Sequence, residues 1–475
     1  MKTWLFLCYF ATWGFIPPLL LLKKRPAATL AWLWAILFIP LLGAVAFFAI
    51  GTDRLKRRRL KRRSLFSARA SRQPVPASTT DDATALLLEK LPLRDRQFLQ
   101  LLSRINQLPL SSTSNIRLLC NAESFYPALE TRIREAVHHV HLEFYIWQDD
   151  PTGARFLQLL TEAARRGVIV RLLLDGVGSY HLPGARLAEF TAAGGQFSWF
   201  QSLDPKRLRF FMNLRNHRKL QIIDGAIAFV GGMNIGREHE NLEAVPGPWR
   251  DVQVEATGSV ACELQEVFAD DWFFATGEKI SHPRFFPPHP GPPRQPAHIV
   301  LGGPDRRNEP VSKSIVSLLN EASHRAWIAT GYFVPDDTVL TALELAASRG
   351  VDVRLLISEK NDRRWLVTVG RSYYGQLLDS GVRLFEYSVG VHHAKIALAD
   401  DQWVMVGSAN LDYRSLRLNF ELNLLFHCRT ANAELACILE HDFGLCQEID
   451  PAVFARRPFR QKFAEAALRP LSPLL

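Results

Sequence analysis

The chain reads Ala163-Ala-Arg-Arg-Gly-Val-Ile-Val-Arg-Leu-Leu-Leu174 in its first half and Ala346-Ala-Ser-Arg-Gly-Val-Asp-Val-Arg-Leu-Leu-Ile357 in its second, 183 residues further on. Upstream of each copy, an apolar run ends in paired aspartates, at residues 145–150 and 332–337. Similarity repeated along one chain indicates an internal duplication. A length of 475 residues leaves room for two such halves.

Each half carries the same order of predicted elements, namely strand, helix and strand. Apolar and β-branched runs predict strands at residues 141–147 and 168–174 in the first half and at 327–334 and 351–357 in the second. Helical periodicity predicts a helix between the strands of each pair, at residues 154–166 and 339–348. A strand, helix and strand in succession form a βαβ unit, whose two strands are parallel. We therefore predict an α/β fold of two duplicated halves, each a mixed, largely parallel sheet flanked by helices, with the active site between the halves.

Composition divides the rest of the chain. The expected segments are two transmembrane helices at residues 3–22 and 27–51 and a basic juxtamembrane segment with linker at 54–110. The first half follows at 111–280, a proline-rich linker at 281–297 and the second half at 298–475. Each of the first two segments is uncharged and about as long as the ~20 residues that cross a bilayer. Eight of the ten residues from Arg54 to Arg63 are basic, which is typical of the cytoplasmic side.

Two alternatives stay open for the front end. A cleaved signal peptide is disfavoured, because the first segment has a weak basic start and no small-residue cleavage site before Lys23. Residues 23–25 are all basic and would fall on the far side of a two-span hairpin, so a re-entrant first segment remains an alternative. The basic run at 54–63 either draws the body onto anionic lipid or serves as a topology signal alone.

The positive charge is concentrated at the front. The net charge is +10, but residues 1–75 hold fourteen Lys and Arg against one Asp, so the remaining residues carry about −3. A protein that grips a phosphate backbone is expected to be basic over its binding domain. We therefore expect no nucleic-acid partner.

A paired motif carries the candidate chemistry. The first half has Asn216-His-Arg-Lys-Leu-Gln-Ile-Ile-Asp224 and, after six residues, Gly231-Gly-Met-Asn234. The second half has His392-His-Ala-Lys-Ile-Ala-Leu-Ala-Asp400 and, after the same gap, Gly407-Ser-Ala-Asn410. One His-x-Lys is common by chance. Two copies with one spacing at equivalent points of a duplication indicate a catalytic site.

Strand geometry brings each histidine and its lysine together. Residues i and i+2 share a face of a strand, so His217 pairs with Lys219 and His393 with Lys395. An imidazole can act as nucleophile or proton carrier at neutral pH, and an ammonium beside it neutralises a phosphoryl oxygen. This charge balance needs no metal and no cofactor.

The supporting residues are less clear-cut. The amides of Asn234 and Asn410 could donate hydrogen bonds to the same phosphoryl oxygens. Asp224 and Asp400 fit either a catalytic role or a turn after a strand. Three nearby histidines begin a core strand and alternate between its faces, so we interpret them as structural, not as a metal cluster: His138, His139 and His141.

These residues resemble the phospholipase D superfamily, whose signature is His-x-Lys-x4-Asp, and within it the bacterial cardiolipin synthases. The resemblance covers nearly the whole chain and adds Pro248-Trp-Arg-Asp251, Asn419-Phe-Glu421 and the run from Gly407 to Ser415 to the strings above. It implies that Asp251 and Glu421 orient the histidines. It also implies unequal halves, because Gly232 stands where the second half has Ser408.

What the resemblance implies for function is a phosphatidyl transfer. One histidine, which we take as His217, attacks phosphorus to form a phosphatidyl-histidine, and His393 serves as the acid, although the order of the two is open. The expected substrates are two phosphatidylglycerol molecules, and the products are cardiolipin and glycerol, at the bacterial cytoplasmic membrane with the catalytic body on the cytoplasmic side.

Two other functions remain as alternatives. A phospholipase D-type hydrolase of phospholipid or nucleic acid would share the same intermediate, and exclusion of water decides between them. A membrane scaffold would need a degenerate site, yet both His-Lys pairs are intact. The use of phosphatidylethanolamine as co-substrate and the oligomeric state, including a homo-oligomer, stay open.

Overall fold

The computed structural model describes residues 12–14, 16–21, 26–47, 82–201, 215–241, 247–288, 291–306, 308–360 and 364–474. The chain divides into two units, of which the first contains the front of the chain. The second consists of Arg62–Leu203 and Leu214–Leu475, and it holds both copies of the His-Lys motif.

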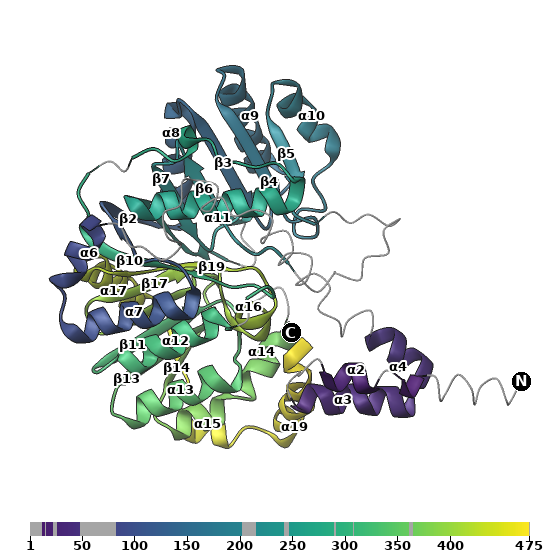
Figure 1. The fold of residues 1–475 in the computed structure, drawn as a ribbon. Coiled ribbons are helices and arrows are strands. Elements are labelled where there is room, and N and C mark those ends of the chain that lie inside the picture. The colour runs from purple at the N-terminus through teal and green to yellow at the C-terminus, as the bar shows by residue number, and fades with distance from the viewer. Residues whose placement is uncertain are drawn as a thin grey trace, which may run out of the picture. The chain divides into compact units, whose positions relative to one another are not determined.

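The first half of the second unit is built on a seven-stranded sheet (Figure 1). Its strands, in spatial order, are β2 (Asn115–Cys120), β9 (Val252–Thr257), β7 (Ile227–Gly231), β6 (Leu220–Ile223), β3 (His139–Phe144), β4 (Ile169–Leu174) and β5 (Gln196–Trp199). One face is covered by α8 (Asn121–Glu135), α9 (Pro151–Arg165) and α10 (Gly184–Ala192), whose apolar side chains form one buried cluster with β3 and β4. The long helix α11 (Ser259–Thr276) packs against β5, β6, β7 and β9.

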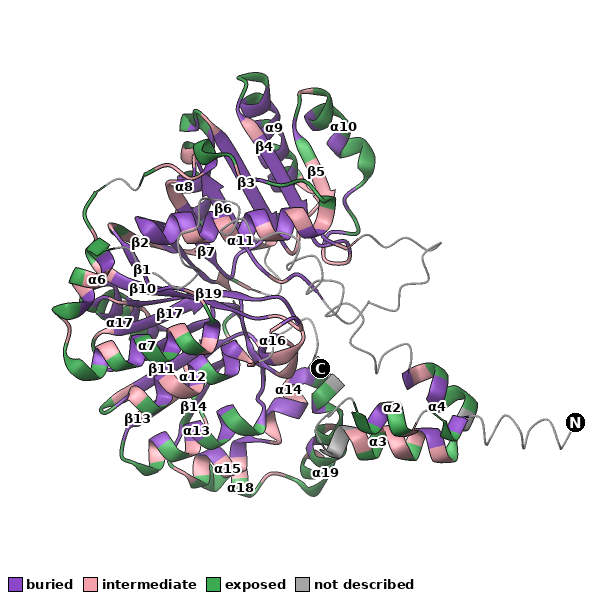
Figure 2. Ribbon diagram, in the orientation of Figure 1, coloured by how far each residue is buried: buried purple, intermediate pink, exposed green. Residues whose placement is uncertain are grey.

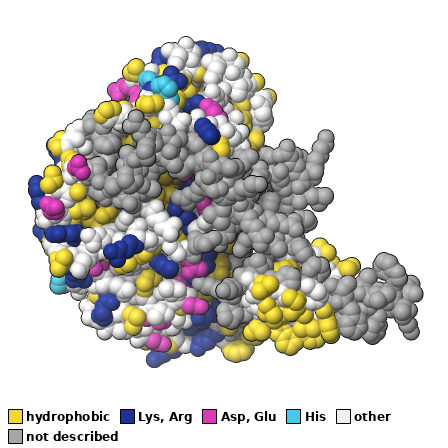
Figure 3. All heavy atoms as spheres, in the orientation of Figure 1, with side chains coloured by type: hydrophobic (Ala, Val, Ile, Leu, Met, Phe, Trp, Pro, Cys, Tyr) yellow, Lys and Arg dark blue, Asp and Glu magenta, His cyan; other side chains and the backbone are white. Residues whose placement is uncertain are grey.

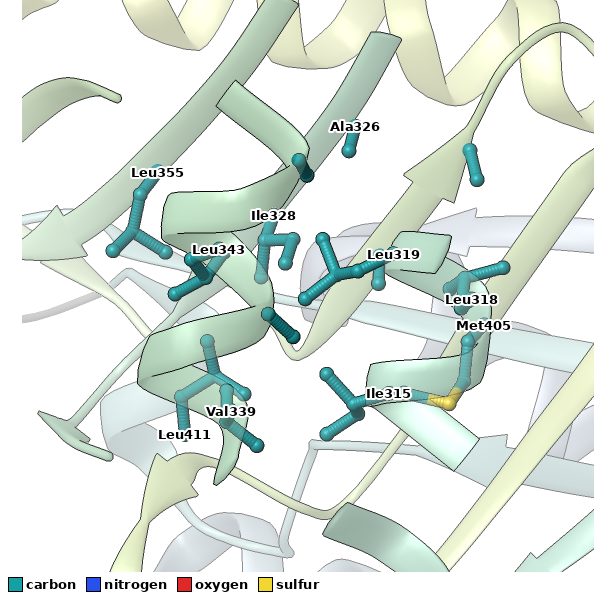
Figure 4. Close-up of a cluster of buried hydrophobic side chains, with 14 of the residues drawn as sticks. Ile315, Leu318, Leu319, Ala326, Ile328, Val339, Leu343, Leu355, Met405 and Leu411 are labelled. Carbon is teal, nitrogen blue, oxygen red and sulfur yellow. The ribbon is translucent and has the colours of Figure 1, made fainter. Parts of the chain in front are cut away.

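The second half is built on a nine-stranded sheet. Its strands, in spatial order, are β1 (Ser111–Thr113), β10 (Gln295–Leu301), β19 (Leu422–His427), β17 (Trp403–Gly407), β16 (Ile396–Ala399), β11 (Arg325–Thr330), β13 (Asp352–Ser358), β14 (Arg383–Tyr387) and β20 (Cys446–Glu448). One face is covered by α7 (Leu93–Asn106), α12 (Pro310–Glu321), α13 (Asp337–Ser348) and α15 (Tyr374–Asp379). Leucines and isoleucines of α12 and α13 meet strand side chains such as Ile328 and Leu355 (Figure 4). Helix α17 (Arg429–Gly444) packs against β14, β17 and β20.

The predicted βαβ units are confirmed. Strands β3 and β4 pair in parallel across α9, and β11 and β13 pair in parallel across α13. Both sheets meet where β7 and β9 of the first contact β17 and β19 of the second. The buried strands therefore run through the middle of the unit, with exposed residues on the outer helices (Figure 2).

The expectation of largely parallel sheets was wrong, because both sheets are mixed. Parallel pairing is confined to β3-β4-β5 and β11-β13-β14 in the main sheets, and the other neighbours pair antiparallel. The reason is the tight turn that follows each His-Lys motif. Asp224 and Gly225 adopt φ values of 53° and 68° and Asp400 a φ of 49°, which reverses the chain into the hairpins β6-β7 and β16-β17.

Among the described residues, no helix is both long and apolar enough to cross a bilayer. The front unit contains α2 (Ile16–Leu21), α3 (Pro26–Phe38) and α4 (Pro40–Ala46) instead of the two expected spans. The rings of Trp32 and Phe47 lie 5.5 Å apart, although 15 residues of straight helix would span about 22 Å. The expected second span is therefore folded back on itself at Pro40. Residues 1–11, 22–25 and 48–81 lie outside the described residues, so most of the first span and the basic run are not among them.

Many apolar side chains of the front helices face outward. Figure 3 shows hydrophobic atoms at the surface of the molecule, and in the front unit the exposed ones include Leu21, Phe38 and Leu42, with exposed fractions of 79%, 68% and 71%. A water-facing helix would normally show polar side chains on that side.

Candidate active site

Both histidines of the paired motif lie where the two halves meet. His217 stands just before β6, and its backbone N–H donates to the carbonyl oxygen of Phe420, in the other half, at 2.9 Å. His393 follows β15 (Val391–His392), which pairs in parallel with β8 (Trp249–Arg250) of the first half. The backbone N–H of His393 donates to the carbonyl of Arg250 at 2.7 Å. Each motif is thus hydrogen-bonded to the backbone of the opposite half.

The carboxylates that hold the histidines are exchanged between the halves. Nδ1 of His217 lies 3.0 Å from Oε2 of Glu421, and Nδ1 of His393 lies 2.7 Å from Oδ2 of Asp251. Both carboxylates are buried. Because an ionised carboxylate only accepts hydrogen bonds, Nδ1 is the protonated ring nitrogen in each pair. Nε2 of each neutral imidazole therefore keeps its lone pair.

The two lysines lie beside the histidines, as the alternation predicted. Nζ of Lys219 donates to the carbonyl oxygen of His217 at 2.7 Å, and Nζ of Lys395 donates to that of His393. Burial and the charge of Lys395 lower the pKa of Lys219 to about 7, although the charge of Glu421 raises it in part. Burial likewise lowers the pKa of Lys395 to about 8. Repulsion between lysines from different halves means that both pairs act within one electrostatic site.

Both histidines are neutral at pH 7 before substrate binds. Burial lowers the pKa of His217, partly offset by Glu421, and burial together with Lys395 lowers the pKa of His393 to about 3. Burial alone would raise the pKa of Asp251, but the charges of His393 and Lys395 outweigh it and lower that pKa to about 2. Buried ammonium groups that repel one another favour an anionic ligand, which a phosphodiester supplies.

The residues after each hairpin differ between the halves. In the second half, the hydroxyl of Ser408 donates to Oε2 of Glu421, the oxygen that also contacts His217. In the first half, a Cβ at Gly232 would lie 2.5 Å from Oδ1 of Asp251. A side chain at position 232 would collide with the carboxylate, which explains the glycine.

The two asparagines also have unequal surroundings. Oδ1 of Asn234 accepts a hydrogen bond from the backbone N–H of Ile146 at 3.1 Å, which leaves its NH2 group as the donor. Oδ1 of Asn410 is buried and has no hydrogen-bond partner in the described part of the chain. A Cβ at Gly331 would lie 3.4 Å from that oxygen and 3.5 Å from Cδ2 of His393, so Asn410 lies next to this histidine.

Asp224 and Asp400, the third members of the signature, do not reach the histidines. The carboxylate of Asp224 accepts the backbone N–H groups of residues 137–139 at 3.0, 2.7 and 2.9 Å, at the start of β3. Asp400 accepts those of residues 323–325 at the start of β11 in the same manner. Both lie at the end of the hairpin strand far from the catalytic pair, and both fix the turn to the neighbouring strand. Their position supports the structural alternative.

The three histidines of β3 take part in packing. Nδ1 of His141 lies 3.0 Å from Oε1 of Gln265, its Nε2 lies 3.1 Å from Nη1 of Arg171, and its ring stacks on Phe268. The ring of His139 lies beside that of His141. Among the described residues, no group of three His, Cys, Asp or Glu side chains could hold a metal ion.

Two arginine side chains whose partners the motifs did not reveal link the halves near the site. Arg218, the residue between the catalytic His and Lys, pairs with Asp271 of α11 and donates to the backbone carbonyls of Gly302 and Glu421 in the second half. Arg250 of the first half donates to Asp442 of α17 at 3.0 Å. A helix from each half thus braces the residue that neighbours a catalytic group.

A third histidine lies close to the site and carried no sequence signal. His239 is buried, its ring centroid lies 4.9 Å from Trp249 and 6.3 Å from His393, and burial lowers its pKa to about 4. Neither of its ring nitrogens has a hydrogen-bond partner among the described residues, and Nε2 is 3.7 Å from Glu238. On the other side, the ring of Tyr145 lies 4.9 Å from that of His217. Aromatic packing in three dimensions, not spacing, identifies these residues.

Known proteins share both the sequence and the fold. The family described as "Cardiolipin synthase, PLD-like domain" matches residues 129–272 and 315–443, and "Phospholipase_D-nuclease N-terminal" matches residues 16–51. A cardiolipin synthase of Geobacillus kaustophilus is 36% identical over 465 residues, covering 95% of this chain and 90% of that protein. One of Geobacillus thermodenitrificans is 35% identical over 462 residues with the same coverage.

Solved structures share the fold at lower identity. A phosphatidylserine synthase of Haemophilus influenzae matches 80% of this chain and 100% of its own with a TM-score of 0.59 at 15% identity. A polyphosphate kinase of Porphyromonas gingivalis matches 84% of this chain and 57% of its own with a TM-score of 0.50 at 14% identity. These two likenesses show the fold alone. The sequence matches go further: this chain belongs to the cardiolipin synthase family of phospholipase D-like proteins.

Proposed function

We propose that this enzyme is a phosphatidyltransferase that makes cardiolipin and glycerol from two molecules of phosphatidylglycerol. The observation that carries the proposal is the pair of histidines at the junction of the halves, each held through Nδ1 by a buried carboxylate of the opposite half. Such a pair provides one nucleophile and one acid for a single phosphorus atom. Cardiolipin synthases that are 35% and 36% identical over 95% of this chain support the same reaction.

The first step forms a covalent intermediate. Nε2 of His217 attacks phosphorus, the bond from phosphorus to the oxygen of the departing glycerol breaks, and His393 gives that oxygen a proton from Nε2. The products of the step are a phosphatidyl group on His217, free glycerol and a neutral His393. Lys219 and Lys395 neutralise the phosphoryl oxygens, and the amide of Asn234 donates to them.

The second step reverses the proton transfer. The hydroxyl oxygen of a second phosphatidylglycerol attacks phosphorus while Nε2 of His393 takes its proton, and the phosphorus–nitrogen bond to His217 breaks. Cardiolipin leaves, and His217 recovers its lone pair.

We assign the proton to His393 because the carboxylate oxygen that contacts it has no second hydrogen bond among the described residues, while the other oxygen of Asp251 accepts the backbone N–H of Val252. Oδ2 of Asp251 contacts His393 at 2.7 Å, whereas Oε2 of Glu421 is shared between His217 and the hydroxyl of Ser408. This unshared acceptor favours His393 as the residue that carries the proton once substrate is bound. The pKa of His393 is about 3 without substrate. Binding of the anionic phosphodiester must therefore raise this pKa, so that His393 takes up a proton from solvent.

Membrane attachment through the front of the chain fits lipid substrates that do not leave a bilayer. Outward-facing apolar side chains on α2, α3 and α4 and the basic run at 54–63 support this, with the body on the cytoplasmic side of a bacterial membrane. Two full spans place residue 24 outside, where a membrane-impermeant thiol reagent would label Lys24→Cys in intact cells. A re-entrant segment leaves it unlabelled.

One assay separates the transferase from a hydrolase of the same fold. The purified full chain is incubated with labelled phosphatidylglycerol in mixed micelles, and cardiolipin plus glycerol are scored against phosphatidic acid. A synthase yields mainly cardiolipin, and predominance of phosphatidic acid would show that water, not alcohol, reaches the intermediate. Rapid acid-free quenching of the unmodified enzyme during turnover should leave the phosphatidyl group on His217, located by mass after proteolysis. A phosphatidyl group on His393 instead would reverse the order of the two roles.

A further inference from the structure

A helix near the C-terminus has an aromatic, basic face that no described residue of the second unit covers. Helix α19 (Phe459–Leu468) carries Phe459 and Phe463, with exposed fractions of 79% and 62%. The two rings lie four residues apart on one side of the helix, with centroids 6.1 Å apart. At 100° per residue, exposed Arg460 and Lys462 flank this aromatic pair on either side. Neither makes an ion pair with a described acidic side chain.

The opposite face fixes the helix to the body, so its exposure does not come from a loose end. Glu465 is buried and accepts from Arg457 at 3.0 and 2.8 Å. Beyond the helix, the hydroxyl of Tyr373 donates to Ser472 at 2.8 Å, and the guanidinium of Arg469 lies 4.4 Å from the ring of Tyr373. The phenylalanines are therefore held outward by an ordered helix.

The helix lies at the edge of the sheet that carries the second histidine. Strand β11 ends at Thr330, and a Cβ on the next residue, Gly331, would lie 3.5 Å from Cδ2 of His393. From this edge, β12 (Phe333–Val334) pairs with β18 (Leu411–Asp412), and α14 (Arg364–Arg371) packs on β12. Helix α19 packs on α14, as Figure 1 also shows, and the turn η6 (Arg469–Leu474) that follows it packs on α16 (Tyr413–Arg417). Helix α19 is thus connected through α14 and β12 to the end of β11, which lies near His393.

We propose that this face of α19, formed by Phe459, Phe463, Arg460 and Lys462, inserts into the interface of an anionic lipid bilayer and turns the catalytic edge of the body toward it. Aromatic rings sit at the level of lipid headgroups, and flanking cations pair with anionic lipid. The contact is a second attachment, separate from the front of the chain. It rests on the proposed function only in that the substrate lies in the bilayer.

The test places a photoreactive aromatic residue on this face of the full chain. In the variant Phe463→p-benzoylphenylalanine, irradiated in phosphatidylglycerol vesicles, lipid adducts are identified by mass. Val137 is the matched control, since it is 82% exposed and lies just before β3 in the other sheet, where its backbone N–H donates to the Asp224 carboxylate. We expect at least about fivefold more lipid adduct at 463 than at Val137→p-benzoylphenylalanine, as interfacial insertion of one face requires.

The charge part is tested with the same readout. Arg460→Glu with Lys462→Glu should lower the adduct yield at 463 in phosphatidylglycerol vesicles, and so should phosphatidylcholine vesicles with the unchanged cations. Equal adduct yields at 463 and 137, indifference to lipid charge, or crosslinks from 463 to the front unit or to a second copy would each overturn the proposal. Crosslinking needs no turnover, so a protein that fails to make cardiolipin can still pass this test.

Discussion

Replacing Asp251 by Asn tests the exchanged carboxylates most directly. The change keeps the size of the side chain but removes the charge that lies 2.7 Å from Nδ1 of His393. A hydrogen bond to a buried charged group contributes about 1.5 to 3 kcal/mol. If that stabilisation is needed only when His393 carries its proton, kcat falls by about 10- to 150-fold, at 1.36 kcal/mol for each factor of ten.

The loss should exceed this range if the new amide turns its NH2 group toward the ring. Its N–H would then donate to Nδ1 of His393 and move the ring proton to Nε2, the atom that must exchange protons with substrate. The effect falls on kcat for cardiolipin formation more than on KM, because phosphate is held by Lys219 and Lys395, whose own contacts to backbone carbonyls do not involve residue 251.

The assay measures kcat with phosphatidylglycerol in mixed micelles, with near-ultraviolet circular dichroism as a check on folding. Glu255→Gln is the matched control, since it removes a carboxylate four residues further on, in β9, where the side chain pairs among the described residues with Arg117 and Arg132 alone. A folded Asp251→Asn enzyme that keeps more than a third of its kcat, or a control that loses as much, would refute the positioning role of Asp251.

Three further results are expected. Asp224→Ala should lower the free energy of unfolding, measured in urea, by about 2 to 4 kcal/mol, because the carboxylate loses three hydrogen bonds from backbone N–H groups. The kcat of the folded variant should stay nearly unchanged, and a large fall in kcat would contradict the structural role of Asp224. In a pH series, kcat/KM should fall as pH rises past about 7 and about 8, where Lys219 and Lys395 lose their protons; a flat profile there would contradict those lowered pKa values. Gly232→Ser should lose most activity, because its Cβ would lie 2.5 Å from the Asp251 carboxylate, and wild-type kcat in this variant would show that the site can relax.

The sequence was sufficient for the parts of the fold that depend on local pattern. The repeat and its periodicities predicted β3, α9 and β4 to within three residues at each end, because a βαβ unit is encoded within one short segment. The order of the sheets is a property of distant segments. Antiparallel hairpins at the Asp224 and Asp400 turns make both sheets mixed. The two aspartates indicate turns in the sequence, but a turn residue alone does not say which strands it pairs.

The candidate site divides in the same way. The spacing predicted that each His and its Lys lie together on a strand. In the structure each lysine Nζ donates to the backbone carbonyl of its histidine, in the segment just before β6 or β16 and not within a strand. The partners of the two imidazoles did not follow from the sequence, since nothing in the spacing says that Asp251 serves His393 and Glu421 serves His217 across the junction. His239 had no motif around it, and only burial against Trp249 brings it near the site.

The exchange of carboxylates makes each half incomplete without the other, and it also separates their roles. In both halves the carboxylate sits beside the second residue of the glycine-containing turn: Asp251 beside Gly232, and Glu421 beside Ser408. Asp251, the shorter carboxylate, lies beside a glycine that has no side chain. Glu421, the longer one, accepts a hydrogen bond from the hydroxyl of Ser408, which lowers the negative charge available to His217. A symmetric duplication would give two histidines of equal basicity. In the proposed mechanism, the imidazole whose carboxylate oxygen is unshared holds the proton and the other attacks phosphorus, so unequal halves suit a reaction whose two histidines must differ.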